Sequence, residues 1–192
     1  MILASASPRR RELLLGAGFD LTIEPADIDE SRLLNEQPLA YVERLARTKA
    51  EATRLAHGPL AEGEVLLAAD TIVWTRDNVL GKPSDKEDAC RMLRELSGDT
   101  HCVSTGVCLM LGTTTRSFVE TTKVAFRPIT DDEIRAYVAT GEPMDKAGSY
   151  AIQGGAKRFV TALDGDYDNV VGLPLQRVMR EIDALRDDAG SR

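Results

Sequence analysis

The sequence has 192 residues, of which 43% are hydrophobic and 29% are charged, a composition typical of one globular domain with a sizeable core. Asp and Glu outnumber Lys and Arg by 31 to 24, and the net charge of −7 argues against a general affinity for nucleic acid. No apolar run approaches the ~20 residues of a membrane-spanning helix, and the N-terminus lacks the features of a secretory signal. We therefore expect a cytoplasmic protein without nucleic-acid or membrane partners.

The first fourteen residues concentrate groups that could bind an anion. Two hydroxyls, Ser5 and Ser7, follow an apolar start, and Pro8 stands where the first residue of a helix would follow a Ser7 cap. Residues 9–11 are all arginine, although positive charge in a first helical turn opposes the helix dipole. A bound phosphate would offset that cost. A solvated basic turn is the alternative, and composition alone does not separate the two.

An acidic loop comes next in the chain. After a short strand predicted at 19–23, the loop at 25–31 holds three carboxylates, those of Asp27, Asp29 and Glu30. Three carboxylates on one loop could bind a hard divalent cation, although a solvated acidic loop is the commoner case.

The strongest apolar run, residues 65–74, predicts a central strand with Asp70 in its middle. A buried carboxylate is costly unless it is paired, hydrogen-bonded or bound to a metal, so we favour a functional role for Asp70. Before this strand, residues 38–57 predict a long amphipathic helix with several basic residues, and the pattern itself does not single out Lys49.

Turn and cap signals organise the second half of the chain. A turn at 75–79 precedes Lys82, which could bind phosphate or simply be exposed, since its surroundings do not match a Walker A loop. Capping boxes at 84–87 and 130–133 open two helices. Glycines at 141–155 would let the backbone approach a ligand closely, and a flexible surface loop is the alternative. The other predicted elements are strands at 100–111, 115–126 and 159–163, a helix at 175–185 and a disordered tail at 187–192, with a single domain over 1–186.

Cysteine usage does not indicate a metal site. Cys90, Cys102 and Cys108 are odd in number and show no C-x-x-C spacing, and the chain has only two histidines. Reduced, buried thiols are therefore expected, and a zinc site is not.

Five motifs stand in order along the chain. They are Leu3-Ala-Ser-Ala-Ser-Pro-Arg-Arg10, Ala69-Asp-Thr-Ile-Val73, Gly81-Lys-Pro83, Asp145-Lys-Ala-Gly-Ser-Tyr150 with Ile152-Gln-Gly154, and Gly165-Asp-Tyr-Asp-Asn-Val-Val-Gly-Leu-Pro174. Together they resemble the motifs of the Maf family of nucleoside triphosphate pyrophosphatases. The resemblance spans residues 2–185, and the order of the motifs makes it specific.

The resemblance implies a two-lobed α/β fold, in which helices flank a curved mixed sheet as in inosine triphosphate pyrophosphatases, with the active-site cleft between the lobes. It implies metal-dependent hydrolysis, with Mg²⁺ or Mn²⁺, of a nucleoside triphosphate to the monophosphate and pyrophosphate in a house-cleaning role. The motifs at 145–148 and 152–154 resemble the subgroup that acts on dTTP and UTP, with modified pyrimidine nucleotides as further candidates. The subgroup acting on 7-methyl-GTP carries Glu in the position of Gln153.

The resemblance also assigns roles to individual residues. Asp70 matches the catalytic aspartate, as general base or metal ligand, and Glu30 would share the metal. Thr71 and Gln153 would read the base, because a carboxamide offers a donor and an acceptor to the O4 and N3–H edge of uracil and thymine. Arg9 would help to select the nucleotide. The residues expected to hold the triphosphate are Ser5, Arg10, Lys49 and Lys82.

The alternative is a nucleotide-binding regulator of cell division or septum formation without essential turnover. It predicts stabilisation by nucleotide without hydrolysis, and Asp70, Glu30 and Lys82 argue against it because binding alone does not need a base. A nucleic-acid-binding module conflicts with the charge of −7 and with only one Trp, four Tyr and four Phe. The expected partner is a small nucleotide, and a homodimer is compatible with the sequence.

Overall fold

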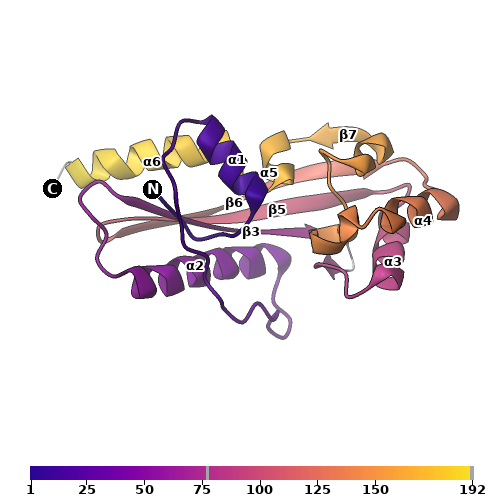
Figure 1. The fold of residues 1–192 in the computed structure, drawn as a ribbon, viewed down its shortest axis with the longest axis horizontal. Coiled ribbons are helices and arrows are strands. Elements are labelled where there is room, and N and C mark those ends of the chain that lie inside the picture. The colour runs from indigo at the N-terminus through magenta and orange to yellow at the C-terminus, as the bar shows by residue number, and fades with distance from the viewer. Residues whose placement is uncertain (77, 191–192) are drawn as a thin grey trace. The chain divides into compact units, whose positions relative to one another are not determined.

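The computed structural model describes residues 1–76 and 78–190, which form the predicted mixed α/β fold (Figure 1). In this part of the chain seven strands form one sheet in the order β2-β1-β3-β5-β6-β7, and β4 pairs with β3. Strand β1 is parallel to β2 and β3, whereas β4 is antiparallel to β3 and β7 is antiparallel to β6. The strands are β1 (Ile2–Leu3), β2 (Thr22–Ile23), β3 (Val65–Trp74), β4 (Val79–Leu80), β5 (Thr100–Leu111), β6 (Thr114–Phe126) and β7 (Val160–Asp164).

Local sequence signals set most of the helix boundaries. The predicted capping box at 130–133 forms at the start of α4. At α3 the predicted box at 84–87 is replaced by Asp85, whose carboxylate accepts a hydrogen bond from Asp88 N at 2.7 Å. None of the described helices is both long and apolar enough to cross a membrane. The helices are α1 (Pro8–Gly16), α2 (Pro38–His57), α3 (Lys86–Leu96), α4 (Asp131–Ala139), α5 (Tyr167–Val171) and α6 (Leu175–Gly190), with 3₁₀ turns at Glu142–Asp145, Ala147–Ser149 and Gly155–Phe159.

The chain forms two compact units. Unit 1 contains Met1–Asp70, Thr105–Glu120 and the chain from Gly172 onward, and unit 2 contains Thr71–Ser104 and Thr121–Val171. The chain passes from one unit to the other within β3, β5 and β6, and again after α5. A single domain over residues 1–186 stays a prediction.

In unit 1 helices α1 and α6 cover one face of the strands (Figure 1). Leu3, Leu67 and Leu109 of neighbouring strands share a buried core with Leu14 of α1 and Ile182 of α6. Side chains two residues apart in a strand point to the same face, which is why the odd-numbered positions of β1 and β3 meet this core.

Helix α6 is longer than the sequence predicts. It continues to Gly190 and so includes residues 187–190 of the predicted tail, whereas residues 191–192 lie outside the described residues. Arg116 of β6 pairs with Glu181 at 3.0 Å and with Asp188 at 2.7 Å, and these contacts hold the second half of α6 against β6.

Helix α2 covers the other face of unit 1 (Figure 1). Ala46 and Ala50 lie in a second buried core with Ile2, Leu66 and Cys108, which are the alternate strand positions. Small side chains on the helix allow its backbone to come close to the sheet.

Gly106 of β5 marks the closest approach. A Cβ atom at this position would fall on the carbonyl group of Val42 in α2, within 2.7 Å of the carbonyl carbon. Since this neighbour is backbone, any larger side chain would push α2 away from the sheet.

Replacing Gly106 with alanine should therefore destabilise unit 1. We expect Gly106→Ala to lower the free energy of unfolding by about 2 kcal/mol, the typical cost of overpacking, as measured by urea unfolding. Gly16→Ala is the matched control, because a Cβ atom at Gly16 meets no atom within 4 Å and should be tolerated. Equal stabilities of the two variants would contradict the close packing of α2.

The core of unit 2 is an aromatic cluster. His101 lies edge-on to Phe126 and Tyr150, with ring centroids 4.8 and 5.3 Å apart, and Phe159 lies edge-on to Phe126 and Tyr137. The Nε2 atom of His101 is 2.8 Å from the Tyr150 hydroxyl, and its Nδ1 atom is buried with no hydrogen-bond partner among the described residues. A buried imidazole in this setting is neutral.

Stability should consequently fall at acidic pH as His101 takes up a proton. Burial lowers the pKa of His101 from 6.5 to about 4, against the opposing effect of Asp99. Between these values the unfolded chain binds more protons than the folded one, so stability decreases as the pH falls through this window, by up to about 3 kcal/mol. Urea unfolding across the window should show a smaller acid-dependent loss in His101→Gln than in the wild-type protein. Identical profiles for the two would show that His101 is not the group responsible.

Candidate functional site

Ser5 and Arg10 of the N-terminal motif are joined by a hydrogen bond. The Nη1 atom of Arg10 donates to Ser5 Oγ at 3.0 Å, and Ser7 N donates to the same hydroxyl at 3.3 Å. Ser7 occupies the cap position of α1, as predicted, but its side chain makes no capping hydrogen bond. The loop between β1 and α1 is thus organised around the Ser5 hydroxyl rather than around a Ser7 cap.

Arg10 is buried and links three segments of unit 1. Its Nε atom donates to Gly172 O and its Nη1 atom to Ala69 O, both at 2.8 Å. Burial lowers the pKa of Arg10, and the nearby charges of Asp70 and Glu30 oppose that shift. With a residue exposure of only 9%, the guanidinium is part of the framework that holds the backbone beside Asp70.

Lys49 brings the two predicted acidic site residues together. Its Nζ atom lies 2.6 Å from Asp70 Oδ1 and 2.7 Å from Glu30 Oε1. The Lys49 and Asp70 side chains are largely buried, whereas the Glu30 side chain is half exposed. The arrangement therefore presents two carboxylates to a single cation.

The acidic loop is attached to helix α2 by two residues that the sequence did not single out. The Tyr41 hydroxyl donates to Glu30 O at 2.8 Å. Arg44 donates to Ser31 O at 3.0 Å and pairs with Glu36 at 2.6 Å. Burial, followed by the charges of Asp70 and Glu30, raises the pKa of Tyr41, so its hydroxyl remains a donor.

The spacing of these anchors was the signal that could have revealed them. Tyr41 and Arg44 are three residues apart, a spacing that places both side chains on one side of a helix. Of the three carboxylates predicted in the loop, Glu30 is the one paired with Lys49, while Asp29 accepts a hydrogen bond from Ser31 N at 2.9 Å.

The residues of unit 1 fit a divalent cation. Mg²⁺ and Mn²⁺ prefer carboxylate oxygens, and Mg²⁺ is commonly held by only one or two carboxylates together with phosphate oxygens of a substrate. Asp70 and Glu30 supply two such groups that converge on one point, which Lys49 Nζ contacts. In the described part of the chain no three His, Cys, Asp or Glu side chains gather as a complete metal site.

Three further predicted site residues belong to unit 2. Thr71 follows Asp70 in β3 and is half-buried, while Lys82 and Gln153 are exposed. Within the described residues Lys82 takes part in no ion pair, so its ammonium group is available to an anion. Arg9, in unit 1, lies in the first turn of α1 and is half-buried.

Two motifs that are distant in the sequence meet in unit 2. Gly148 N donates to Gly81 O at 3.0 Å, next to Lys82. A Cβ atom at Gly148 would lie 2.8 Å from the Val73 side chain, and φ is +66° there, so only glycine suits this position. The contact joins the segment around Asp145–Tyr150 to the segment that carries Lys82.

Replacing Arg10 with lysine should lower stability even though the charge is kept. Lysine cannot reproduce the planar fork that bonds Ser5, Ala69 O and Gly172 O, and we expect a loss of about 2 kcal/mol by urea unfolding. Arg9→Lys is the matched control and should change stability by less than about 0.5 kcal/mol. A similar small effect at both positions would exclude a framework role for Arg10.

Comparisons with known proteins agree with the motifs described above. The family model described as "Maf-like protein" matches residues 1–185. A relative from Koribacter versatilis (strain Ellin345) is 50% identical over 180 residues, 94% of this chain and 91% of that protein. Relatives from Geobacter sp. (strain M21) and Geobacillus sp. (strain WCH70) are 51% and 48% identical, covering 97% and 96% of this chain and 94% and 97% of theirs. All three relatives are named dTTP/UTP pyrophosphatase.

Proposed function

Because the chain belongs to the Maf family, we propose that it is a nucleoside triphosphate pyrophosphatase that hydrolyses the α–β phosphoanhydride of dTTP and UTP. Water adds to the α-phosphorus, the bridging bond breaks, and the products are the nucleoside monophosphate and pyrophosphate. The convergence of Asp70 and Glu30 on Lys49 is the observation that carries the proposal. The names of relatives that share about half of its residues support the choice of substrate. Removal of unwanted or modified pyrimidine nucleotides is the proposed role.

Asp70 is proposed to handle the attacking water. It is largely buried, and its carboxylate oxygens can accept a hydrogen bond from a water molecule. Asp70 and Glu30 are also the residues that would hold Mg²⁺ or Mn²⁺, which would polarise the phosphate and acidify a bound water. Lys49 holds both carboxylates in place and can turn to a phosphate oxygen when substrate binds.

Cationic and hydroxyl groups are proposed to bind the triphosphate. Lys82 is exposed and can follow the phosphate chain, and Ser5 offers its hydroxyl beside the buried Arg10. These groups offset negative charge that develops on the leaving pyrophosphate. Arg9 is proposed to help select the nucleotide, a role that the resemblance to the dTTP/UTP subgroup implies.

Gln153 and Thr71 are proposed to select the base. The Gln153 side chain is exposed, so its carboxamide can donate to O4 and accept from N3–H of uracil or thymine. A cytoplasmic location and a homodimer remain predictions that this assignment does not require.

Substitution of Asp70 is the direct test of the reaction. Asp70→Asn should lower kcat/KM for UTP and dTTP by about 10²- to 10⁴-fold, because an amide cannot accept the proton or ligate the cation as a carboxylate does. Pyrophosphate release is measured over a panel of normal and modified triphosphates, with and without Mg²⁺ or Mn²⁺, and circular dichroism checks the fold.

Asp27→Asn is the matched control for loss of one negative charge. Asp27 lies exposed in the same loop as Glu30, and we expect its substitution to leave turnover unchanged. Unchanged activity in Asp70→Asn would remove Asp70 from the reaction. Stabilisation of the wild-type protein by UTP without any pyrophosphate release would instead favour a nucleotide-binding regulator.

A further inference from the structure

The loop that carries Gln153 is held at both ends by one pair of side chains. Ala151 N donates to the Tyr137 hydroxyl at 3.1 Å. Gly155 N donates to the two carboxylate oxygens of Glu142 at 3.1 and 3.2 Å. The Tyr137 hydroxyl in turn donates to Glu142 Oε1 at 2.7 Å, which connects the two ends through a single hydrogen-bond chain.

The hydroxyl of Tyr137 is suited to this position because it both donates and accepts. The residue is 2% exposed, and its ring packs edge-on against Phe159 with centroids 5.7 Å apart. At this depth a lost partner is not replaced by solvent, so the amide of Ala151 depends on the hydroxyl.

Gly154 brings the loop directly against the Glu142 carboxylate. A Cβ atom at Gly154 would lie 2.5 Å from Glu142 Cδ and 2.6 Å from Oε2. The Glu142 carboxylate therefore occupies the space that a side chain at position 154 would need. Any larger residue at 154 must displace it and break its bonds to Tyr137 and Gly155.

Tyr137 and Glu142 are themselves held in position by neighbouring residues. Glu142 N donates to Thr140 Oγ1 at 3.2 Å, that hydroxyl donates to Tyr137 O at 2.7 Å, and Lys146 Nζ donates to Glu142 O at 2.8 Å. Tyr150, which precedes the loop, bonds the buried His101.

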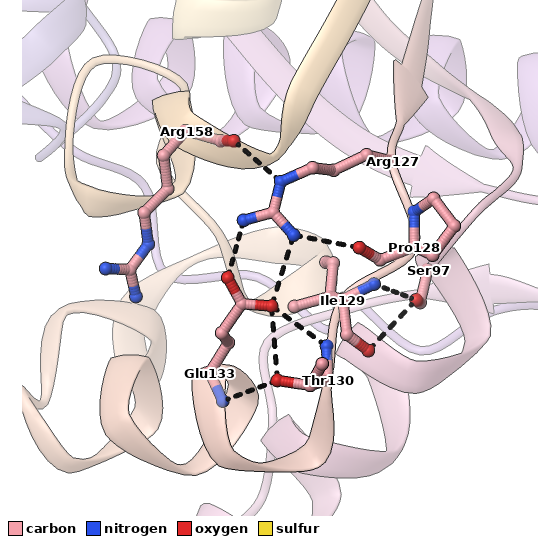
Figure 2. A network of polar contacts seen from close by, with 7 residues as sticks. All are labelled: Ser97, Arg127, Pro128, Ile129, Thr130, Glu133 and Arg158. Atoms are coloured by element: carbon pink, nitrogen blue, oxygen red, sulfur yellow. Dashed lines mark hydrogen bonds and ion pairs between the residues drawn. The ribbon is translucent and has the colours of Figure 1, made fainter.

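Helix α4, which carries Tyr137, is tied down at its N-terminus. Arg127 donates to both carboxylate oxygens of Glu133, at 2.6 and 3.1 Å, and Glu133 also closes the capping box with Thr130. Figure 2 shows these contacts. Arg127 additionally donates to Pro128 O and Arg158 O (Figure 2). The helix therefore gives Tyr137 a fixed base.

We propose that Tyr137 and Glu142 are positioning residues that make Gln153 selective for uracil and thymine over cytosine, an inference that rests on the proposed function. A carboxamide can present its donor and acceptor in either order, and the two orders match uracil and cytosine respectively. Only a loop held in one conformation places Gln153 where a single order is favoured. Neither residue needs to touch the nucleotide for this effect.

The test compares kcat/KM for UTP with kcat/KM for CTP. Tyr137→Phe and Glu142→Ala should each lower this ratio by about tenfold, mainly by raising KM for UTP while kcat changes little. Gly154→Ala should act in the same direction by displacing the carboxylate. Glu142→Gln should restore part of the ratio, since its carbonyl oxygen can still accept from Gly155 N, and the double variant should be no worse than either single one.

Two controls separate selection from general damage. Tyr167→Phe changes an exposed tyrosine and should leave the ratio unchanged, and Leu185→Ala creates a cavity in the core of unit 1 and should lower stability without altering the ratio. A ratio that stays at the wild-type value in Tyr137→Phe and Glu142→Ala overturns the inference, as does an equal fall in Leu185→Ala.

A different result would refute the proposed function itself. If the wild-type protein releases no pyrophosphate from UTP or dTTP, the proposed pyrophosphatase activity is wrong. If the wild-type protein is active but Gln153→Ala keeps the ratio of kcat/KM for UTP to kcat/KM for CTP, Gln153 does not select the base. Tyr137 and Glu142 then have no selectivity to support.

Discussion

The carboxylate of Asp70 lies in an apolar strand and is stable there only as one member of a set of opposite charges. Lys49 pairs with it at 2.6 Å, and Arg10 holds the neighbouring carbonyl of Ala69. Well-packed hydrophobic residues commonly stabilise a core as well as such buried charges do. The charges are therefore better explained by the proposed function than by stability, since a phosphate chain and a divalent cation would need both signs in one place.

Helix α2 connects this set of charges to the fold. Its buried side packs on the sheet, where Gly106 permits backbone contact with Val42, and Lys49 lies on that same side, four residues after Leu45. Movement of the helix away from the sheet would move Lys49 with it. The packing of α2 on the sheet therefore also fixes the distances from Lys49 to Asp70 and Glu30, because one rigid helix carries both the packed residues and Lys49.

In unit 2 packed residues likewise fix the position of a loop. Gln153 is exposed and has no packing of its own, yet the backbone on either side of it is bonded to Tyr137 and Glu142. The backbone that carries this proposed base-reading residue is thus held by a buried aromatic residue and a carboxylate, and the positions of both depend on the caps of α4. Supporting residues of this kind decide how narrowly a site distinguishes similar ligands.

The sequence by itself determined the α/β class, the bounds of the helix at 38–57 and the strand at 65–74, and the family, because periodicity, caps and motif spelling are local properties. Only the tertiary structure decided that Glu30 rather than Asp29 pairs with Lys49, and that Arg10 is buried against two carbonyl groups. It likewise brought Tyr137 to the loop of Gln153. These contacts join segments far apart in the chain, and their geometry arises from packing, on which a local pattern carries no information.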